Sequence, residues 1–358
     1  MKSMLFILLL NILMSHCIKN NIDSPLEEFN SEVILEANVI DIDKELGFPG
    51  IITNSPRYLI LQDISLQDNS YFIIIDKHSG LTINNFGLKG KGPDELLHPI
   101  TLDYLYDNKI GIYDAVNIKY YVYSLDNLIS DRPLQVEKKV DGSIQTPIQG
   151  DRFMKVVSIN DSLFVGMWSH PEGRYCLFNN EKKVKKLLYP DFPYDKKHEE
   201  ESRYIKSFAF QYNLKISPDR TKLCAASLSC GHLELFNISG DSLTKYLDKL
   251  YYLPLYEKFP SDKVLGAVFF KESLPGFNYL DVTDKHIYLS FPSMKKDIVH
   301  QVAVNEYILK YDWNGNAITK YKVDRPIGFF TVDDRNQKIY ATTIDTSSYE
   351  SKLIYFDL

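Results

Sequence analysis

The sequence predicts an all-β fold, a single six-bladed β-propeller with four-stranded antiparallel blades whose last blade is closed by an N-terminal strand. Three observations lead to this prediction. Tyr and Phe are abundant, at 25 and 20 of 358 residues, and they occur in short runs of the kind that favours half-buried strands. A pattern of strand, tight turn and strand recurs six times. A strand-like segment also precedes the first repeat and has no copy of its own to join.

The repeat is an apolar strand, a tight turn rich in Asp, Asn, Pro or Arg, a second strand, a loop, and an aromatic-rich strand that ends in Asp or Asn. The six copies begin at Ile51, Ile100, Val156, Leu214, Tyr279 and Phe329. Successive first turns, near residues 54, 108, 161, 220, 284 and 336, are 52 to 64 residues apart. This period exceeds the roughly 40–50 residues of common propeller repeats, so each copy has room for four strands and a long loop. An irregular β-sandwich is the alternative, but sandwiches rarely contain so many similar hairpins at near-constant spacing.

The N-terminal segment SEVILEANVID, residues 31–41, is expected to close the ring. The last repeat ends at Leu358 where an outermost strand should follow. Propellers protect their strand edges by pairing first and last blades. We therefore expect residues 32–40 to lie beside residues 352–357.

The first residues, MKSMLFILLLNILMSHC, are typical of an export signal. Lys2 precedes an apolar run over 4–14, which is shorter than the roughly 20 residues that span a bilayer but suits a secretory signal. We assign residues 1–16 to a signal peptide and predict lipidation of Cys17, as in bacterial lipoproteins. The positions one and three before the cysteine depart from the usual lipobox, so simple secretion and a buried structural cysteine remain alternatives.

The sequence also predicts the domain organisation, the location and the class of partner. Residues 17–30 are expected to form a polar tether, and residues 31–358 a single propeller domain. The predicted location is extracytoplasmic, either periplasmic or at the outer membrane, with membrane contact through a lipid anchor only. The chain has 41 basic and 47 acidic residues, which argues against a nucleic-acid partner.

The remaining cysteines are Cys176, Cys224 and Cys230. In an exported chain two of them can form a disulfide, which leaves one free. Their spacing does not resemble a zinc pair, and small buried hydrophobic residues are the favoured interpretation.

The stretch FGLKGKGPDEL, residues 86–96, has the glycine content of a phosphate loop but not its pattern. A Walker A loop requires lysine where Pro93 stands, and a dinucleotide-binding loop requires a third glycine where Glu95 stands. The stretch falls where one blade ends and the next begins. Gly90 and Gly92 can adopt positive φ angles there without steric strain, so the sequence predicts an interblade joint.

Three stretches around this joint carry a resemblance to a known family. FIIIDKHSG, the joint FG-x-x-G-x-GP-x-E, and NKIGIYD-x-x-N-x-KYYVYSLD resemble the TolB-like six-bladed β-propeller lipoproteins of Bacteroidetes. The specific part covers about residues 58–126, and the later blades match in pattern only. Asp94 and Leu96 depart from the family's usual glycine and aromatic residue. The resemblance implies an extracytoplasmic propeller and implies no catalytic residues.

Binding residues are expected on one face of the propeller. The turns between the first and second strands are short and gather on what we call the short-turn face. The interblade joints and the loops between second and third strands gather on the opposite, long-loop face. Long, variable loops of this kind usually carry the ligand contacts. Candidate ligand contacts on the long-loop face are Lys91, His98, Arg152, Trp168, His170, Arg174 and Arg203. An aromatic ring beside Arg and His can stack on a sugar or hold a carboxylate, although the stronger interpretation is that Trp168 packs between blades and that His170-Pro171 shapes a hairpin loop.

These observations favour a monomeric binding or protein-interaction module over an enzyme. The sequence contains no nucleophile elbow, no H-E-x-x-H motif and no histidines at metal-binding spacing, and it predicts no catalytic residue, no metal and no cofactor. The expected partner is a glycan, a peptide or an envelope protein. The alternatives are a carbohydrate-active hydrolase or lyase with its site at the central channel mouth, and a scaffold in envelope assembly.

Overall fold

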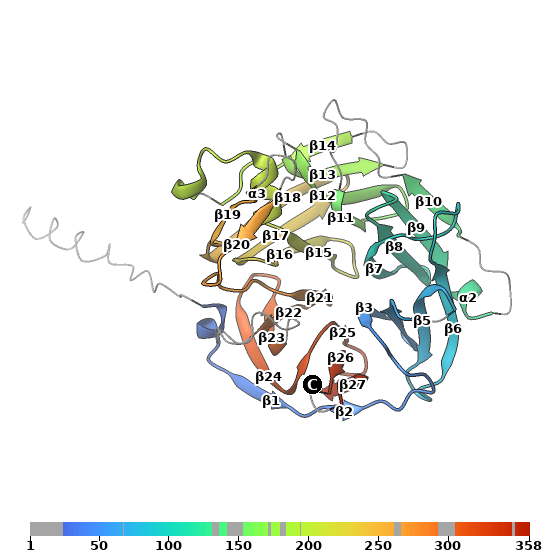
Figure 1. Cartoon of the computed structure of the whole chain (residues 1–358). Helices are drawn as coiled ribbons and strands as arrows, with labels where there is room; N and C mark the ends of the chain where they lie inside the picture. Colours follow the sequence, from blue (N-terminus) through green and yellow to red (C-terminus); the bar gives the residue numbers. More distant parts are fainter. Residues whose placement is uncertain are drawn as a thin grey trace, which may run out of the picture.

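Six antiparallel sheets surround a central axis (Figure 1). The computed structural model describes residues 24–66, 68–130, 136–141, 153–170, 173–179, 184–193, 195–260, 266–292, 305–345 and 348–358. The predicted fold class and the predicted number of blades are confirmed.

Each predicted repeat begins on the innermost strand of a blade. The first blade contains β3 (Pro49–Asn54), β4 (Tyr58–Asp63), β5 (Ser70–Asp76) and β6 (Thr82–Leu88), and the second contains β7 (Pro99–Leu105), β8 (Lys109–Asp114), β9 (Lys119–Ser124) and β10 (Lys138–Asp141). The third contains β11 (Phe153–Ser158), β12 (Leu163–His170), β13 (Gly173–Asn179) and β14 (Val184–Leu188), and the fourth contains β15 (Tyr212–Ile216), β16 (Lys222–Ser227), β17 (Gly231–Ser239) and β18 (Ser242–Tyr252). The fifth contains β21 (Tyr279–Val282), β22 (His286–Pro292), β23 (Asn305–Asp312) and β24 (Ala317–Ile327), and the sixth contains β25 (Phe330–Asp333), β26 (Lys338–Ile344) and β27 (Ser351–Asp357).

A short N-terminal strand, β2 (Asn38–Val39), completes the sixth blade. It runs antiparallel to β27, with Asn38 opposite Tyr355 and Val39 opposite Ile354. The backbone N–H of Ile40 extends this pairing by donating to a carbonyl of β27 at 2.9 Å. The predicted closure of the ring is therefore confirmed.

The strand before it, β1 (Glu32–Leu35), joins a different blade. It pairs in parallel with β24, with Glu32 opposite Lys320 and Leu35 opposite Val323, so the fifth blade has five strands. The expectation that residues 32–40 lie beside residues 352–357 is therefore met by residues 38–40 and is wrong for residues 32–35, which the repeat pattern did not place on the fifth blade. A single N-terminal segment runs along the outer edges of two adjacent blades and covers both (Figure 1).

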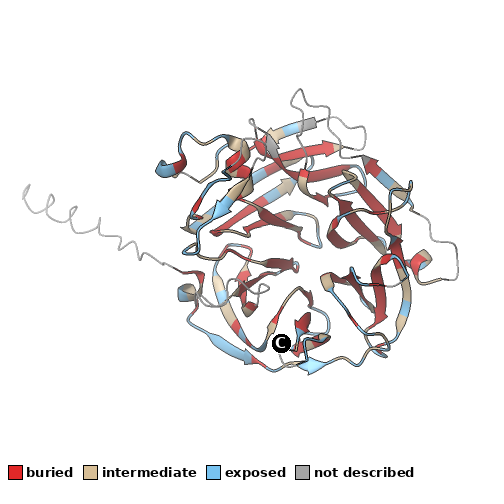
Figure 2. Ribbon diagram, viewed as in Figure 1, coloured by how far each residue is buried: buried red, intermediate tan, exposed pale blue. Residues whose placement is uncertain are grey.

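The core lies between the blades. Each sheet is covered by a neighbouring sheet on both faces, so the middle strands are apolar at consecutive positions rather than at alternate ones, as in the fully buried run Phe72–Ile75 of β5. Figure 2 shows burial along the inner and middle strands and exposure along the outer edge of the ring. Cys176, Cys224 and Cys230 are free thiols within this core, and burial raises the pKa of each.

Short elements decorate the ring. They are the 3₁₀ turns η1 (Pro25–Glu28) and η2 (Lys196–His198), the helices α2 (Leu125–Leu128) and α3 (Arg203–Ala209), and the hairpin of β19 (Tyr256–Lys258) and β20 (Ala267–Phe269). Within the described ranges, none of the helices has the length and apolar character needed to cross a membrane.

Residues 24–30, which the sequence assigns to the polar tether, contact the propeller. The ring of Phe29 is buried and meets Tyr311 edge-on at 5.0 Å, and the carboxylate of Glu28 accepts from Lys249 at 2.9 Å. This part of the segment thus packs against the fourth and fifth blades.

The glycine-rich stretch connects β6 to β7 and is the predicted interblade joint. Gly87 and Gly90 adopt φ angles of 73° and 153°, which favour glycine. The carboxylate of Glu95 accepts a hydrogen bond from the Gly92 N–H at 2.6 Å. The carboxylate of Glu95, which belongs to the same loop, therefore already binds the backbone N–H that an incoming anion would need.

Candidate functional site

A cavity of about 360 Å³ lies at the centre of the short-turn face. It is lined by the last residues of the inner strands and by the turns that follow them. All six inner strands run toward this face, so each blade contributes polar side chains there; the cavity includes Asn54, Asp103, Ser158, Lys215, Asp281 and Asp333.

An ion pair crosses the channel at the cavity. Lys215 of the fourth blade places its Nζ 2.6 Å from Oδ1 of Asp103 in the second blade. Burial lowers the pKa of Lys215, but the attraction of Asp103 outweighs burial and the net pKa is raised. The bond joins blades that are not adjacent in the ring, and it fixes both charges in the channel.

The carboxylate of Asp281 occupies the opposite side of the cavity. Its Oδ2 accepts from the Thr331 hydroxyl at 2.9 Å and from the Val332 N–H at 2.8 Å. Burial raises the pKa of Asp281, and nearby Lys215 opposes that effect. The fifth-blade acid is thereby held against the inner strand of the sixth blade.

Lys77 links the first and sixth blades at the edge of the cavity. Its Nζ lies 2.5 Å from Asp333 Oδ2 and donates to Asn54 Oδ1 at 3.0 Å. Asn54 in turn donates to the Thr331 hydroxyl at 2.7 Å. Burial lowers the pKa of Lys77, and the ion pair with Asp333 opposes the change.

The rim of the cavity carries a cation beside an aromatic ring. The guanidinium of Arg220 lies over the Tyr106 ring, 5.4 Å from its centroid, and donates to the Ser158 carbonyl at 3.1 Å. The Tyr106 hydroxyl donates to Asp161. Such a platform can stack against a sugar ring or a peptide group.

Tyr279 forms a second link across the channel. Its hydroxyl donates to the backbone carbonyl of Ile52 at 3.4 Å. Tyr279 belongs to the fifth blade and Ile52 to the first. The sixth blade separates these two blades in the ring, so the bond crosses the channel. Both residues precede the cavity-lining positions of their strands, which places the crossing deeper than the cavity.

The residues predicted from the sequence do not gather around one site. Lys91 and His98 are exposed on the long-loop face, and Arg203 donates to the Pro190 carbonyl. Trp168 is buried and its ring lies 5.5 Å from that of Phe153, in agreement with the packing interpretation. Arg152, Cys17 and the side chain of His170 lie outside the described residues.

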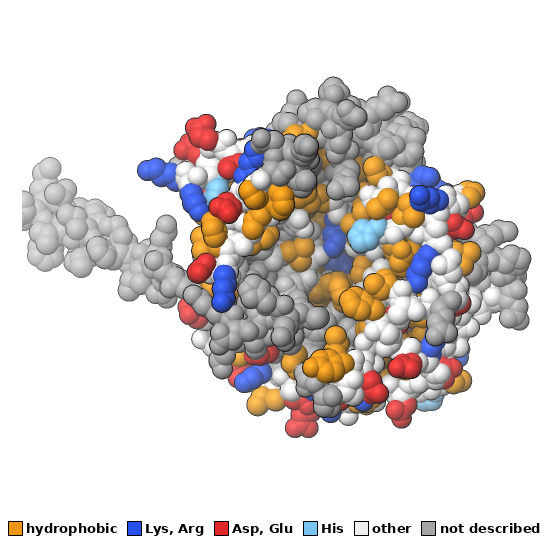
Figure 3. Space-filling model, viewed as in Figure 1, with side chains coloured by type: hydrophobic (Ala, Val, Ile, Leu, Met, Phe, Trp, Pro, Cys, Tyr) orange, Lys and Arg blue, Asp and Glu red, His pale blue; other side chains and the backbone are white. Residues whose placement is uncertain are grey.

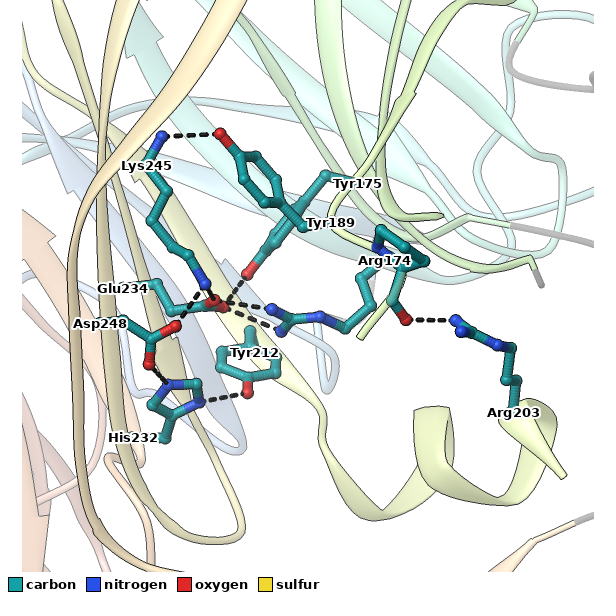
Figure 4. A network of polar contacts seen from close by, with 10 residues as sticks. Arg174, Tyr175, Tyr189, Arg203, Tyr212, His232, Glu234, Lys245 and Asp248 are labelled. Atoms are coloured by element: carbon teal, nitrogen blue, oxygen red, sulfur yellow. Dashed lines mark hydrogen bonds and ion pairs between the residues drawn. The ribbon is translucent and has the colours of Figure 1, made fainter. Parts of the chain in front are cut away.

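Arg174 belongs to a buried network between the third and fourth blades (Figure 4). Its guanidinium binds both carboxylate oxygens of Glu234, at 2.9 and 2.6 Å. Glu234 also accepts from the Tyr175 hydroxyl at 2.6 Å and from Lys245 at 3.0 Å. Because Arg174 is only 2% exposed and both terminal nitrogens of its guanidinium bind Glu234, its side chain joins two blades.

His232, Glu234 and Asp248 are the group of described residues whose ligand atoms lie close enough together, within 4.8 Å, to suit a metal ion. His232 Nε2 lies 2.8 Å from Asp248 Oδ1, and its Nδ1 lies 2.6 Å from the Tyr212 hydroxyl. Lys245 contacts both carboxylates of the group. Positively charged side chains thus already neutralise these acids, and a metal ion would have to displace them.

The sequence reasoning missed the cavity residues, although a signal was present. A charged residue stands shortly before the first turn in LDYL, LKIS and LDVT, which contain Asp103, Lys215 and Asp281. A charge on an otherwise apolar inner strand suggests a channel position. The ion pair between Asp103 and Lys215 joins residues 112 positions apart along the chain, so the pattern alone does not reveal it.

Comparisons with known proteins agree with the architecture. Among solved structures, a Bacteroides fragilis protein named as exported superposes with a TM-score of 0.55 and 12% identity, over 90% of this chain and 94% of that one. A member of the DUF4221 family from Bacteroides vulgatus gives 0.52 and 11%, over 91% and 96%. Regucalcin, a calcium-binding protein from Agrobacterium tumefaciens, gives 0.51 and 11%, over 92% and 97%. At these identities the likeness shows the fold alone.

No curated protein is similar to the chain in sequence. The family model described as TolB-like 6-blade propeller-like matches residues 34–335, which is most of the chain. Six blades, the closing N-terminal strand and this match lead to one conclusion: the chain belongs to the TolB-like six-bladed β-propeller family.

Proposed function

We propose that this protein is an exported, lipid-anchored binding protein that holds a small polar ligand, a glycan or a peptide, in the cavity of the short-turn face. The observation that carries the proposal is the convergence of fixed charged side chains from several blades on one cavity of about 360 Å³. Small-molecule sites typically occupy about 300–1,000 Å³ and contain a few well-placed polar groups.

The polar groups of the cavity suit binding because their positions are set before a ligand arrives. Lys215 and Asp103 hold each other at 2.6 Å, and Asp281 is held by the Thr331 hydroxyl and a backbone N–H. Pre-organised donors and acceptors of both signs reduce the entropy cost of binding a molecule with many hydroxyl or amide groups. The stacked Arg220 and Tyr106 provide a flat surface at the rim.

A hydrolase with its site at the channel mouth is a second candidate, and Asp281 is the residue that favours it. Burial raises the pKa of this carboxyl group, as a general acid requires. The other buried acids of the cavity, Asp103 and Asp333, are each paired with a lysine. A carboxylate held by a lysine is not free to serve as a catalytic acid or base, so we favour binding over hydrolysis.

The N-terminal sequence supports export and anchoring, and the likeness to a Bacteroides fragilis protein named as exported agrees with export. We propose that Cys17 carries the lipid and that residues following it connect the anchor to the propeller. A periplasm-facing or surface-facing position at the outer membrane would place the cavity where glycans and peptides arrive.

Calorimetric titration tests the binding proposal. A panel of neutral mono- and disaccharides and dipeptides is titrated into the wild-type protein, into Lys215→Met and Asp281→Asn, and into Lys186→Met, which removes an exposed lysine on the outer strand β14. We expect at least one member to bind, with affinity reduced about tenfold or more by either cavity variant and unchanged by the control. Binding that the cavity variants leave unaltered would place the ligand elsewhere, and cleaved products after prolonged incubation would favour the hydrolase.

A further inference from the structure

Lys155 lies in the channel beyond the cavity. It belongs to β11, and its Nζ lies 2.6 Å from Oδ1 of Asn213 on β15. Asn213 precedes Lys215 by two residues, which corresponds to about 7 Å along the strand toward the long-loop face. Neither Lys155 nor Asn213 lines the cavity of the short-turn face. The pair therefore occupies a separate layer of the channel.

The charge of Lys155 has no compensating acid in this layer. In the described part of the chain, no carboxylate lies within ion-pair distance of its Nζ, and Asp103 of the neighbouring layer is taken by Lys215. Burial lowers the pKa of Lys155 to about 8, with Lys215 adding to the effect and Asp103 opposing it. At neutral pH the layer holds one positive charge, and among the described residues its direct partner is the amide oxygen of Asn213.

Solvent reaches this layer from the long-loop side. The Lys155 side chain is half-buried rather than buried, although it lies deep in the molecule. Figure 3 shows a hollow at the centre of one face, between the inner strands of the second, third and fourth blades, with Lys or Arg side chains inside it. A small molecule can therefore approach a cation at the bottom of the hollow.

A second polar group in the same layer lacks a partner. The Thr101 hydroxyl on β7 makes no hydrogen bond to any described residue, and the residue is only 4% exposed. Thr101 precedes Asp103 by two residues, so the two side chains lie on the same side of β7. The Asp103 side chain faces the channel, and the Thr101 side chain therefore faces it too. A buried hydroxyl without a partner costs free energy that a ligand atom can restore.

We propose that Lys155 and Thr101, with Asn213 positioning the ammonium group, form a binding site for the carboxylate of a small organic acid. One uncompensated positive charge matches one carboxylate, and the hydroxyl donates to its second oxygen. A phosphate dianion fits less well, because its second charge would face the carboxylate of Asp103 without a cation of its own. The site lies outside the proposed ligand cavity and does not depend on it.

NMR of protein labelled with 13C at the lysine Cε tests this site directly, with Lys155 assigned from its loss in Lys155→Met. Acetate supplies the carboxylate alone, acetamide is its neutral isostere, and inorganic phosphate is the competing anion. We expect saturable binding of acetate at pH 7 that raises the pKa of Lys155 above its free value of about 8. Acetate affinity should fall about tenfold between pH 7 and pH 9, because only the charged lysine binds the anion.

Two variants and their matched controls complete the test. Lys155→Met should weaken acetate binding about 10- to 100-fold and Thr101→Val about 3- to 10-fold. Lys186→Met and Thr244→Val change exposed residues of outer strands and should leave the affinity unaltered. An equal response to acetamide, tighter binding of phosphate than of acetate, or full acetate binding by Lys155→Met would each overturn the proposal.

Discussion

Arg174 of the third blade and Glu234 of the fourth blade form a bidentate ion pair, with N–O distances of 2.9 and 2.6 Å, between side chains that are 2% and 0% exposed. Taking two charges out of water is costly, and the cost is offset only where the geometry satisfies both groups. Here the forked geometry, the Tyr175 hydroxyl and Lys245 satisfy the Glu234 carboxylate, while Arg174 Nε has no partner among the described residues. The pair therefore fixes how two neighbouring blades meet.

Replacing one partner of this pair should be strongly destabilising. Glu234→Gln leaves the Arg174 guanidinium buried without a counter-charge, and we expect a loss of about 3–5 kcal/mol in the free energy of unfolding. Urea denaturation followed by tryptophan fluorescence measures it. The control is Asp357→Asn, which breaks the more exposed pair with Lys338 and should cost less than about 1 kcal/mol. Equal losses in the two variants would contradict the assigned role of burial.

The same pair should make stability depend on acid pH. Burial raises the pKa of Glu234, but Arg174 outweighs burial and lowers it from 4.5 to about 2. A carboxyl group whose folded pKa is depressed stabilises the protein above its unfolded pKa and loses that contribution as pH falls toward the folded value. We therefore expect the free energy of unfolding to decline between about pH 4.5 and pH 2.

A double variant isolates this contribution. Arg174→Met with Glu234→Leu replaces the pair by apolar groups, a change that is often close to neutral at pH 7. Denaturation curves at pH 6, 4 and 3 should show a smaller decline for the double variant than for the wild type. Parallel declines would mean that other carboxyl groups cause the acid sensitivity.

Of two adjacent residues in the N-terminal strand β1, we expect only the buried one, Leu35, to contribute strongly to the stability of the protein. Leu35 is 5% exposed and packs in the core, whereas its neighbour Ile34 is 67% exposed. Leu35→Ala should cost about 2–4 kcal/mol and Ile34→Ala less than about 0.5 kcal/mol, because only the first leaves a cavity. Thermal denaturation of both variants provides the comparison. Similar melting temperatures for the two would show that β1 does not dock on the fifth blade in solution.

Lipidation at Cys17 is testable in cells. The wild-type protein should incorporate labelled palmitate and sediment with membranes, and Cys17→Ser should lose the label and appear in the soluble fraction. Cys224→Ser, which changes a buried thiol of the core, should retain the label. An unlabelled wild-type protein would leave simple secretion as the better explanation of the N-terminal sequence.

The number of blades and the closure of the ring could be predicted from the sequence because both depend on short segments of the chain. A hairpin is encoded by residues close together in the chain, so six similar hairpins at near-constant spacing predict six blades. The unpaired segment 31–41 predicts the closure, because a propeller suppresses exposed strand edges. The joint around Gly90 was likewise recognisable from the absence of the residues that a phosphate loop requires.

The candidate ligand contacts could not be predicted in the same way, because the sequence pattern does not show in which direction a charged side chain points. Arg174 was proposed as a ligand contact on the long-loop face, yet its side chain points into the interface where Glu234, 60 residues later, receives it. Whether a charged side chain faces solvent or a neighbouring blade depends on the twist and packing of two sheets, and neither can be inferred from one strand.

By itself, then, the sequence determined the all-β class, the six repeats, the closing N-terminal segment and the interblade joint, because strand-forming apolar and aromatic runs and turn chemistry act over a few residues. Only the tertiary structure decided which groups meet: Asp103 with Lys215 across the channel, Arg174 with Glu234 between blades, and Lys155 with the amide of Asn213. These partners are brought together by the circular arrangement of the blades, so their electrostatics exist only once the ring has closed.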